Sequence, residues 1–295
     1  MKRPLLIFIV LAFGLSWAVA LPLWLGRGLA SPQLTLVATI MMFTPTAGVL
    51  GAWAVSRTPF REWARQTGLT FGDRKKRTAV LLLTAWLGVP LLTLLAMGLS
   101  AAVGAVSLDL DHFSLLRSAL GARSAQTPAD LGTVAVLQIV VAVVAGPALN
   151  AIPALGEEWG WRGWLLPRLV SSNGMFAGLV FTGAIWGVWH APLTLLGYNY
   201  PRLGSWAALF FIGFCVLFGM VIGWLRLRTG SVWPSVVAHG SLNAVAGPVL
   251  LFGDAAAPPN EVLVGVTGLV GWALLALVGA ALLRFYPVRR PQPAA

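Results

Sequence analysis

Long apolar segments are the feature that most constrains what this chain can fold into. Eight segments each hold about 20 mainly apolar residues, the length that an α-helix needs to cross a bilayer. The apolar runs are continuous and do not alternate with polar residues, which argues against strands. We therefore predict an all-α, polytopic membrane bundle of about eight transmembrane helices. The expected spans are Leu5–Leu25, Leu34–Val55, Ala79–Leu99, Thr133–Ile152, Met175–Leu196, Trp206–Leu225, Ser231–Phe252 and Val262–Phe285.

The composition agrees with a membrane protein and excludes several other classes. Apolar residues make up 58% of the 295 residues and charged residues only 10%, too few to cover a water-exposed surface. This excludes a disordered or collagen-like chain, and the single cysteine, Cys215, excludes a disulfide scaffold. A net charge of +11 is compatible with a nucleic-acid partner, but the hydropathy argues against one. We expect the lipid bilayer as a partner and no nucleic acid.

The basic residues predict how the spans are oriented. With eight spans and a cytoplasmic N-terminus, 16 of the 20 Lys and Arg residues fall in cytoplasmic segments, as the positive-inside rule requires. We therefore expect a multi-pass protein of the cell membrane with both termini in the cytoplasm. The high content of Ala, Arg and Trp is typical of a bacterial chain. The basic residues expected on the outer side are Arg27, Arg117, Arg123 and Arg202.

The start of the chain has two interpretations. Lys2 and Arg3 before an apolar run resemble a signal peptide. The apolar stretch continues through Leu25, which favours an uncleaved first span. We expect one integral-membrane domain, residues 1–295, in which residues 130–250 form the catalytic core.

A first charged motif interrupts the fourth apolar segment. Ionisable groups inside a membrane helix are costly, so each one is a functional candidate. As a single helix, residues 133–170 would extend about 57 Å, which is too long for one span. Prolines and glycines in this stretch weaken the helix, and we expect it to be broken near Pro147–Gly156. Glu158 and Arg162 are four residues apart and can pair, which leaves Glu157 free for chemistry.

Two further motifs place histidines within later spans. Trp186 lies one helical turn before His190, and His239 shares a helix face with Asn243. Measured from the nearest inner turns, these groups and Glu157 lie about 14 to 24 Å deep along their helices. We expect all four site residues to meet in one cavity that is reached from the inner side. The Trp residues nearby are interpreted as core and interfacial belt.

An acid and two imidazoles in a shielded cavity suit hydrolysis. Glu157 is the candidate general base, and His190 the candidate holder of the same water. His239 and Asn243 are candidate donors to the oxyanion of a tetrahedral intermediate. The alternative is a catalytic zinc held by Glu157, His190 and His239. Because Asn is a poor zinc ligand, we favour a site without a cofactor.

The order and spacing of these motifs resemble those of the CPBP intramembrane proteases, also called the CAAX-protease or Abi family. The resemblance covers residues 157–243, less than a third of the chain. It implies a bundle of about eight membrane helices, Glu157 as the water-activating base, His190 as its partner, and His239 with Asn243 as oxyanion donors. Trp186 replaces the Phe that is more usual in the family. The three motifs are Glu157-Glu158-Trp159-Gly160-Trp161-Arg162, Trp186-Gly187-Val188-Trp189-His190 and His239-Gly240-Ser241-Leu242-Asn243.

The predicted function is that of an intramembrane endopeptidase acting on a membrane-associated, lipidated or membrane-inserted substrate. Membrane acids and histidines also serve proton relays, so a proton-coupled transporter is the first alternative. A non-catalytic immunity or binding protein is the second. The sequence gives neither the identity of the substrate nor the oligomeric state.

Overall fold

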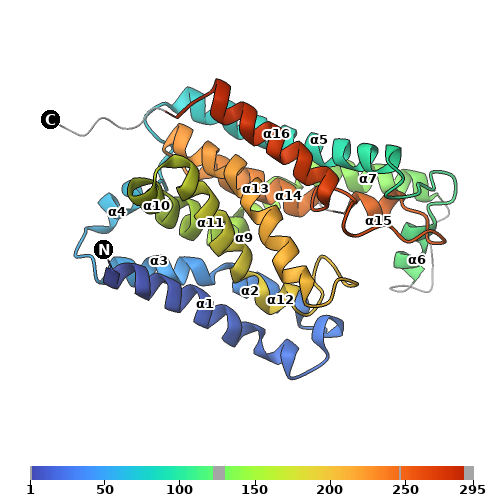
Figure 1. The fold of residues 1–295 in the computed structure, drawn as a ribbon, viewed down its shortest axis with the longest axis horizontal. Coiled ribbons are helices and arrows are strands. Elements are labelled where there is room, and N and C mark those ends of the chain that lie inside the picture. Colours follow the sequence, from blue (N-terminus) through green and yellow to red (C-terminus); the bar gives the residue numbers. More distant parts are fainter. Residues whose placement is uncertain (1, 122–129, 246, 289–295) are drawn as a thin grey trace.

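The computed structural model describes residues 2–121, 130–245 and 247–288, and within them it is a bundle of helices (Figure 1). The predicted all-α membrane bundle is confirmed. Arg123, Arg289 and Arg290, which the charge count used, lie outside the described residues. The first half of the bundle contains α1 (Lys2–Trp24), η1 (Gly28–Ala30), α2 (Leu34–Met42), α3 (Thr44–Ala54), α4 (Phe60–Gln66), α5 (Lys75–Ala102), α6 (Ser114–Gly121) and α7 (Leu131–Val144).

The second half carries the three motifs. It contains α8 (Gly146–Leu149), α9 (Ala151–Glu158), the π-helical segment η2 (Trp159–Leu165), α10 (Leu166–Asn173), α11 (Met175–Trp189), α12 (Ala191–Thr194), α13 (Trp206–Thr229), α14 (Trp233–Val245), α15 (Pro248–Phe252) and α16 (Leu269–Phe285).

The eight expected spans correspond to helices of unequal length. Among the described residues, five helical stretches are long and apolar enough to cross a membrane. The other three expected spans contain shorter apolar helices, namely α7, α11 and α16. The last span is shorter than predicted because residues 262–268 form turns and α16 begins only at Leu269. The second span is divided at Phe43, and Pro45 lies in the first turn of α3, where a proline is tolerated.

The predicted break in the fourth span is confirmed and lies between α7 and α9. The helix stops at Ala145 and again at Asn150, whose side-chain amide donates a hydrogen bond to the carbonyl of Gly146 (2.9 Å). Gly156, by contrast, lies inside α9 and not in the break. A Cβ at this position would lie 2.8 Å from the Met42 carbonyl, so the glycine allows α9 to pack against α2.

Glycines also bring α11 and α13 together. A Cβ on Gly183 would lie 2.6 Å from the Cα of Val216, and one on Gly187 would lie 2.6 Å from the Cα of Ile212. The two glycines are four residues apart and therefore on one face of α11. Small residues at this spacing are the usual means of close helix contact in membranes. The contact fixes the helix that carries Trp186.

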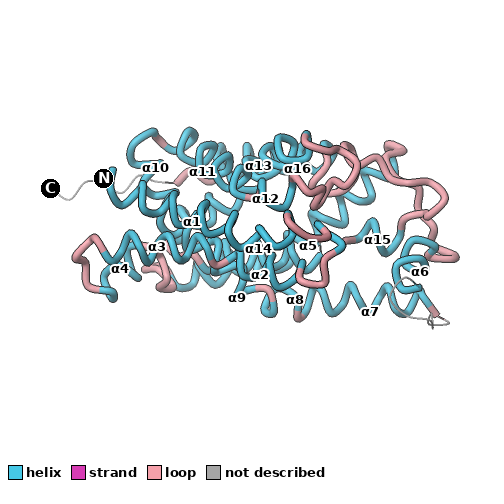
Figure 2. The backbone as a smooth tube through the Cα atoms, turned by 90° about the horizontal axis from the view of Figure 1, so that it is seen from below, coloured by secondary structure: helices cyan, strands magenta, loops and turns pink. Residues whose placement is uncertain are grey.

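The helix ends define two opposite ends of the bundle. The start of α1, α4 and α10 lie at one end, and α6 and α15 lie at the other (Figures 1 and 2). The first end also holds the ends of α13 and α16. The indole of Trp224 in α13 donates a hydrogen bond to the carbonyl of Tyr286, which follows α16 (2.9 Å). At the second end, the Tyr200 hydroxyl donates to the Thr267 carbonyl (2.9 Å), next to the start of α16. We call these the terminus end and the loop end.

Candidate active site

One cavity of about 370 Å³ collects residues from all three motifs. Glu157, His190, His239 and Asn243 all line it. They come from the end of α9, the end of α11 and one face of α14. The structure therefore brings together the four predicted site residues, while their roles remain predictions.

Glu157 is held in the last turn of α9 and is only 2% exposed. One carboxylate oxygen, Oε2, accepts a hydrogen bond from the Trp186 indole nitrogen (2.7 Å). The other oxygen accepts no hydrogen bond from the described residues. A carboxylate with one oxygen held and the other turned to a cavity is arranged to accept a proton there.

Glu158 points to a different set of partners than Glu157. Successive residues on a helix lie about 100° apart, so the two side chains diverge. The Oε1 of Glu158 accepts hydrogen bonds from Arg162 Nη1 (2.9 Å) and His239 Nδ1 (2.9 Å). Arg162 and Glu158 are both fully buried. The pairing of Glu158 with Arg162 that their spacing suggested is present, and it extends to His239.

The surroundings of His190 determine which of its nitrogens is available. Its Nδ1 lies 2.8 Å from the backbone carbonyl of Trp186. A carbonyl oxygen only accepts hydrogen bonds, so Nδ1 carries the proton. The neutral ring then offers Nε2 as an acceptor. The rings of Trp186, Trp189 and Phe211 pack around the imidazole with centroids 4.8 to 5.4 Å away, which fixes its direction.

His239 and Asn243 lie on the same face of α14, as their spacing predicts. Because Nδ1 of His239 contacts the Glu158 carboxylate, Nε2 is the nitrogen left for a substrate. To donate from Nε2, the ring must carry both protons. The Asn243 amide has no hydrogen-bond partner among the described residues, so its two N–H groups are available to a ligand.

Trp186 is the site residue whose role the sequence interpretation missed. It was treated as part of an aromatic core, but its indole N–H binds Glu157 and its ring lies 4.1 Å from the Arg162 guanidinium carbon. Its ring also packs against His239, with centroids 5.4 Å apart. The signal was present in the chain. A Trp one turn before His190 has an N–H donor that the Phe typical of the resembled family lacks.

The cavity reaches a different end of the bundle from the one predicted. The sequence predicted entry from the inner side, where the termini were expected. The lining instead extends to Thr35 in the first turn of α2, to Tyr198 and Asn199 before α13, and to Thr267 before α16. All of these positions lie at the loop end. Depth along the helices located the floor of the cavity correctly but did not indicate which way it opens.

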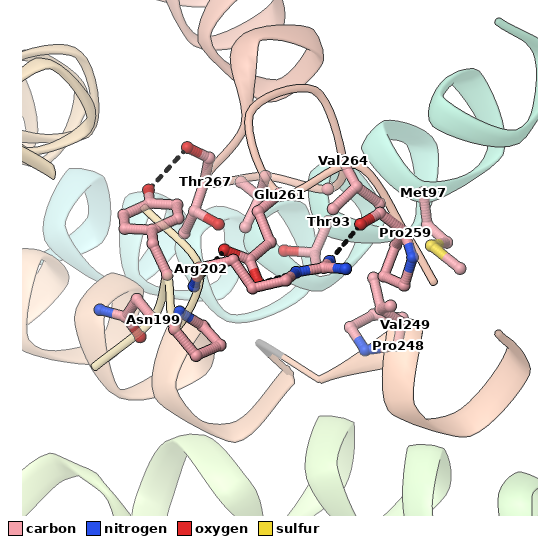
Figure 3. A pocket seen from close by; sticks show the side chains of 14 residues that line it. Thr93, Met97, Asn199, Arg202, Pro248, Val249, Pro259, Glu261, Val264 and Thr267 are labelled. Carbon is pink, nitrogen blue, oxygen red and sulfur yellow. Dashed lines mark hydrogen bonds and ion pairs between the residues drawn. The ribbon is translucent and has the colours of Figure 1, made fainter. Parts of the chain in front are cut away.

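A second cavity of about 220 Å³ adjoins the first at the loop end. Asn199 and Thr267 line both cavities. Arg202 and Glu261 lie together within the second one (Figure 3) and form an ion pair of 2.7 Å. This pair ties the segment before α13 to the segment before α16. It is separate from the cluster of Glu157 and the two histidines.

The zinc alternative would require a cluster of metal ligands, and the described part of the chain has no preformed one. No group of three His, Cys, Asp or Glu side chains there is arranged to hold a metal ion. Nδ1 of both His190 and His239 is already engaged by protein oxygens. A metal would therefore have to use the Nε2 atoms. Whether the site works without a cofactor remains a prediction.

Comparisons with known proteins agree with the motifs. Residues 133–245 match the sequence model of the type II CAAX prenyl endopeptidase Rce1-like family. This match lies within the predicted catalytic core, residues 130–250, and includes all four predicted site residues. The chain is also similar to CAAX prenyl protease 2 of Methanococcus maripaludis, with 28% identity over 100 residues. That alignment covers 32% of this chain and 37% of the relative. These two matches support the family assignment made from the three motifs.

Proposed function

We propose that this chain is an endopeptidase that hydrolyses a peptide bond of a membrane-associated protein or peptide inside the bilayer. The observation that carries the proposal is the convergence of a buried carboxylate, Glu157, and two imidazoles, His190 and His239, on one cavity. They come from three separate helices. Ionisable groups at membrane depth are rarely retained without a function.

The geometry supports a direct attack by water. Glu157 accepts one proton from a water molecule, while Nε2 of His190 accepts a hydrogen bond from its other hydrogen. The water oxygen bonds to the carbonyl carbon of the scissile peptide, and the carbonyl oxygen becomes an oxyanion. His239 and Asn243 donate hydrogen bonds to that oxyanion. The proton held by Glu157 passes to the amide nitrogen, and the oxyanion re-forms the carbonyl as the C–N bond breaks. A carboxylic acid and an amine leave, and the acid gives its proton to the amine or to water.

The surroundings of the cavity support a substrate with a large apolar part. Asn150 and Asn243 also line an open groove of about 580 Å³ between α7 and α14. Most of its other lining is apolar, and Leu137 and Val141 are exposed on the surface of the bundle. A lipid chain or an apolar helix lying in this groove would bring an adjoining peptide to Asn243. The name of the Methanococcus maripaludis relative, CAAX prenyl protease 2, makes a lipid-modified peptide the first substrate to test.

The test is cleavage of a lipid-anchored peptide by the purified full chain in liposomes. Product masses identify the cut bond, and the same peptide without its anchor measures what the anchor contributes. His190→Ala should abolish cleavage, whereas Thr70→Ala, in the exposed loop before α5, should not. Equal turnover by His190→Ala would contradict the proposal. Uptake of a solute into the liposomes without any cleavage would instead favour the transporter alternative.

A further inference from the structure

The accessible part of the candidate cavity lies at the loop end of the bundle. Glu157 and His239 at its floor are 2% and 4% exposed. Thr35, Tyr198 and Asn199 also line the cavity, and they are exposed. Asn243 is exposed as well, but toward the apolar groove between α7 and α14, so the polar route to the carboxylate runs from Thr35, Tyr198 and Asn199.

The chain path shows that these residues share one end. α1 begins at Lys2, ends at Trp24 at the loop end, and is followed by a short connection to α2. Thr35 lies in the first turn of α2. The indole of Trp24 donates to the Pro192 carbonyl (2.8 Å), which places α12 at the same end. Tyr198 follows α12 and precedes α13, which runs back toward the terminus end.

The cavity is closed toward the terminus end. Beyond Glu157 the chain continues as η2, in which Trp161, Arg162 and Trp164 are at most 1% exposed. Phe8 of α1 stacks on Trp164, with ring centroids 4.7 Å apart, and meets Trp161 edge to face at 5.5 Å. These large side chains fill the space that a passage to that end would need.

The two ends differ strongly in charge. Among the described residues outside the cavity cluster, the loop end has three basic residues, Arg27, Arg117 and Arg202, and five acidic ones. The terminus end has only Glu62 and Asp73 as acids. Its exposed or half-exposed basic residues include Arg57, Arg61, Arg65, Arg74, Lys75, Lys76, Arg77, Arg168, Arg228 and Arg284. By the positive-inside rule, the terminus end is cytoplasmic and the loop end is not.

We propose that the candidate active site is reached from the non-cytoplasmic side of the membrane. Its substrate would then be an exported or outwardly exposed segment of a membrane-associated peptide, and not a cytoplasmic tail. The chemistry of this substrate rests on the proposed peptidase function. The direction of access rests only on the cavity lining and the charge distribution.

Cysteine accessibility tests the direction of access without requiring any turnover. Cys215 is fully buried, so the wild-type chain provides the background. Single cysteines are placed at Tyr198 and Thr39, which line the cavity, and at Thr70 at the terminus end. The probe is a membrane-impermeant charged methanethiosulfonate, applied to intact cells and to inside-out vesicles. This reagent needs a thiolate in water, so reaction at Thr39→Cys reports a water-filled path and not contact with lipid.

The proposal predicts that Tyr198→Cys and Thr39→Cys react at least 10-fold faster in intact cells than in inside-out vesicles, and that Thr70→Cys shows the reverse. Reaction of Thr39→Cys mainly from the cytoplasmic side, or equally from both sides, would overturn it. The proposal would also be overturned if the thiol of Thr39→Cys reacts after denaturation but reacts from neither side of the membrane in the folded protein. If Cys215 of the wild-type chain reacts with the probe, the test is repeated with the single cysteines placed in a Cys215→Ala chain. Outward labelling without any peptide cleavage would leave the access route standing and remove the peptidase function.

Discussion

The indole nitrogen of Trp186 lies 2.7 Å from a carboxylate oxygen of Glu157, while the ring of the same Trp lies beneath the Arg162 guanidinium. One side chain thus connects the buried ion pairs of Glu158 to the carboxylate that faces the cavity. A hydrogen bond from a fixed donor restricts the rotamers of Glu157. We infer that Trp186 is a positioning residue.

Replacing Trp186 by Phe should lower kcat about 10- to 100-fold and leave KM within about twofold. Phe retains an aromatic ring but lacks the N–H donor, and a hydrogen bond to a charged group contributes about 1.5–3 kcal/mol. The matched control is Trp224→Phe, which removes an indole hydrogen bond to the Tyr286 carbonyl far from the cavity. An equal loss of kcat in both variants would show that the indole of Trp186 has only a structural role.

Glu158→Gln should lower the stability of the folded protein in detergent. Glu158 binds two groups, Arg162 and His239, inside the bundle, and breaking a buried ion pair leaves an uncompensated charge that costs about 3–5 kcal/mol. Glu261→Gln is the matched control, because its partner Arg202 is half exposed and such pairs contribute about 0–1 kcal/mol. Thermal unfolding monitored by circular dichroism should show a clear drop in midpoint for Glu158→Gln only. Similar midpoints for the two variants would contradict the assigned importance of this buried cluster.

Gly187→Ala should weaken both folding and activity. The added methyl group would lie 2.6 Å from the Cα of Ile212 and push α11, with Trp186 and His190, away from α13. Gly98→Ala in α5 is the control, because a Cβ there meets no atom within 4 Å. Alanine in a helix is favoured over glycine by about 0.5–1 kcal/mol, so this control should be as stable as the wild type or more so. Loss of stability in Gly98→Ala alone would refute the packing explanation.

Chelators separate the two versions of the hydrolytic mechanism. With a site that works without a cofactor, dialysis against 1,10-phenanthroline or EDTA followed by a peptide assay should leave kcat unchanged. Full inactivation that added Zn²⁺ reverses would favour the zinc alternative, in which Glu157, His190 and His239 act as ligands. Metal content measured on the active protein decides whether a partial effect is specific.

Much of the fold could be predicted from the sequence because a membrane span is recognised by its length and hydropathy. The break in the fourth span followed from prolines that cannot donate hydrogen bonds. The convergence of Glu157, His190, His239 and Asn243 followed from helical rise and alternating chain direction. These are local properties, and each can be evaluated without knowing which helices are neighbours.

The remaining features depend on contacts that no local pattern encodes. The indole of Trp186 reaches Glu157 because glycines let α11 approach α13. The four-residue spacing of Gly183 and Gly187 indicates a close helix contact, but it does not say which helix is the neighbour. The direction in which the cavity opens depends on where Trp161 and Trp164 pack against Phe8. One oxygen of Glu158 contacts both Arg162 and His239. This shared contact likewise depends on the relative positions of three helical segments.

The most direct test of the proposed mechanism is the turnover of Glu157→Gln in liposomes with a peptide that the wild-type chain cleaves. Gln keeps the size of the side chain and can still bind the Trp186 indole through its carbonyl oxygen, but it does not accept a proton from water. We predict that kcat falls at least 100-fold, the scale of a general base, while the unfolding midpoint stays near that of the wild type. A Glu157→Gln protein that is folded and cleaves the peptide at the wild-type rate would contradict the proposal.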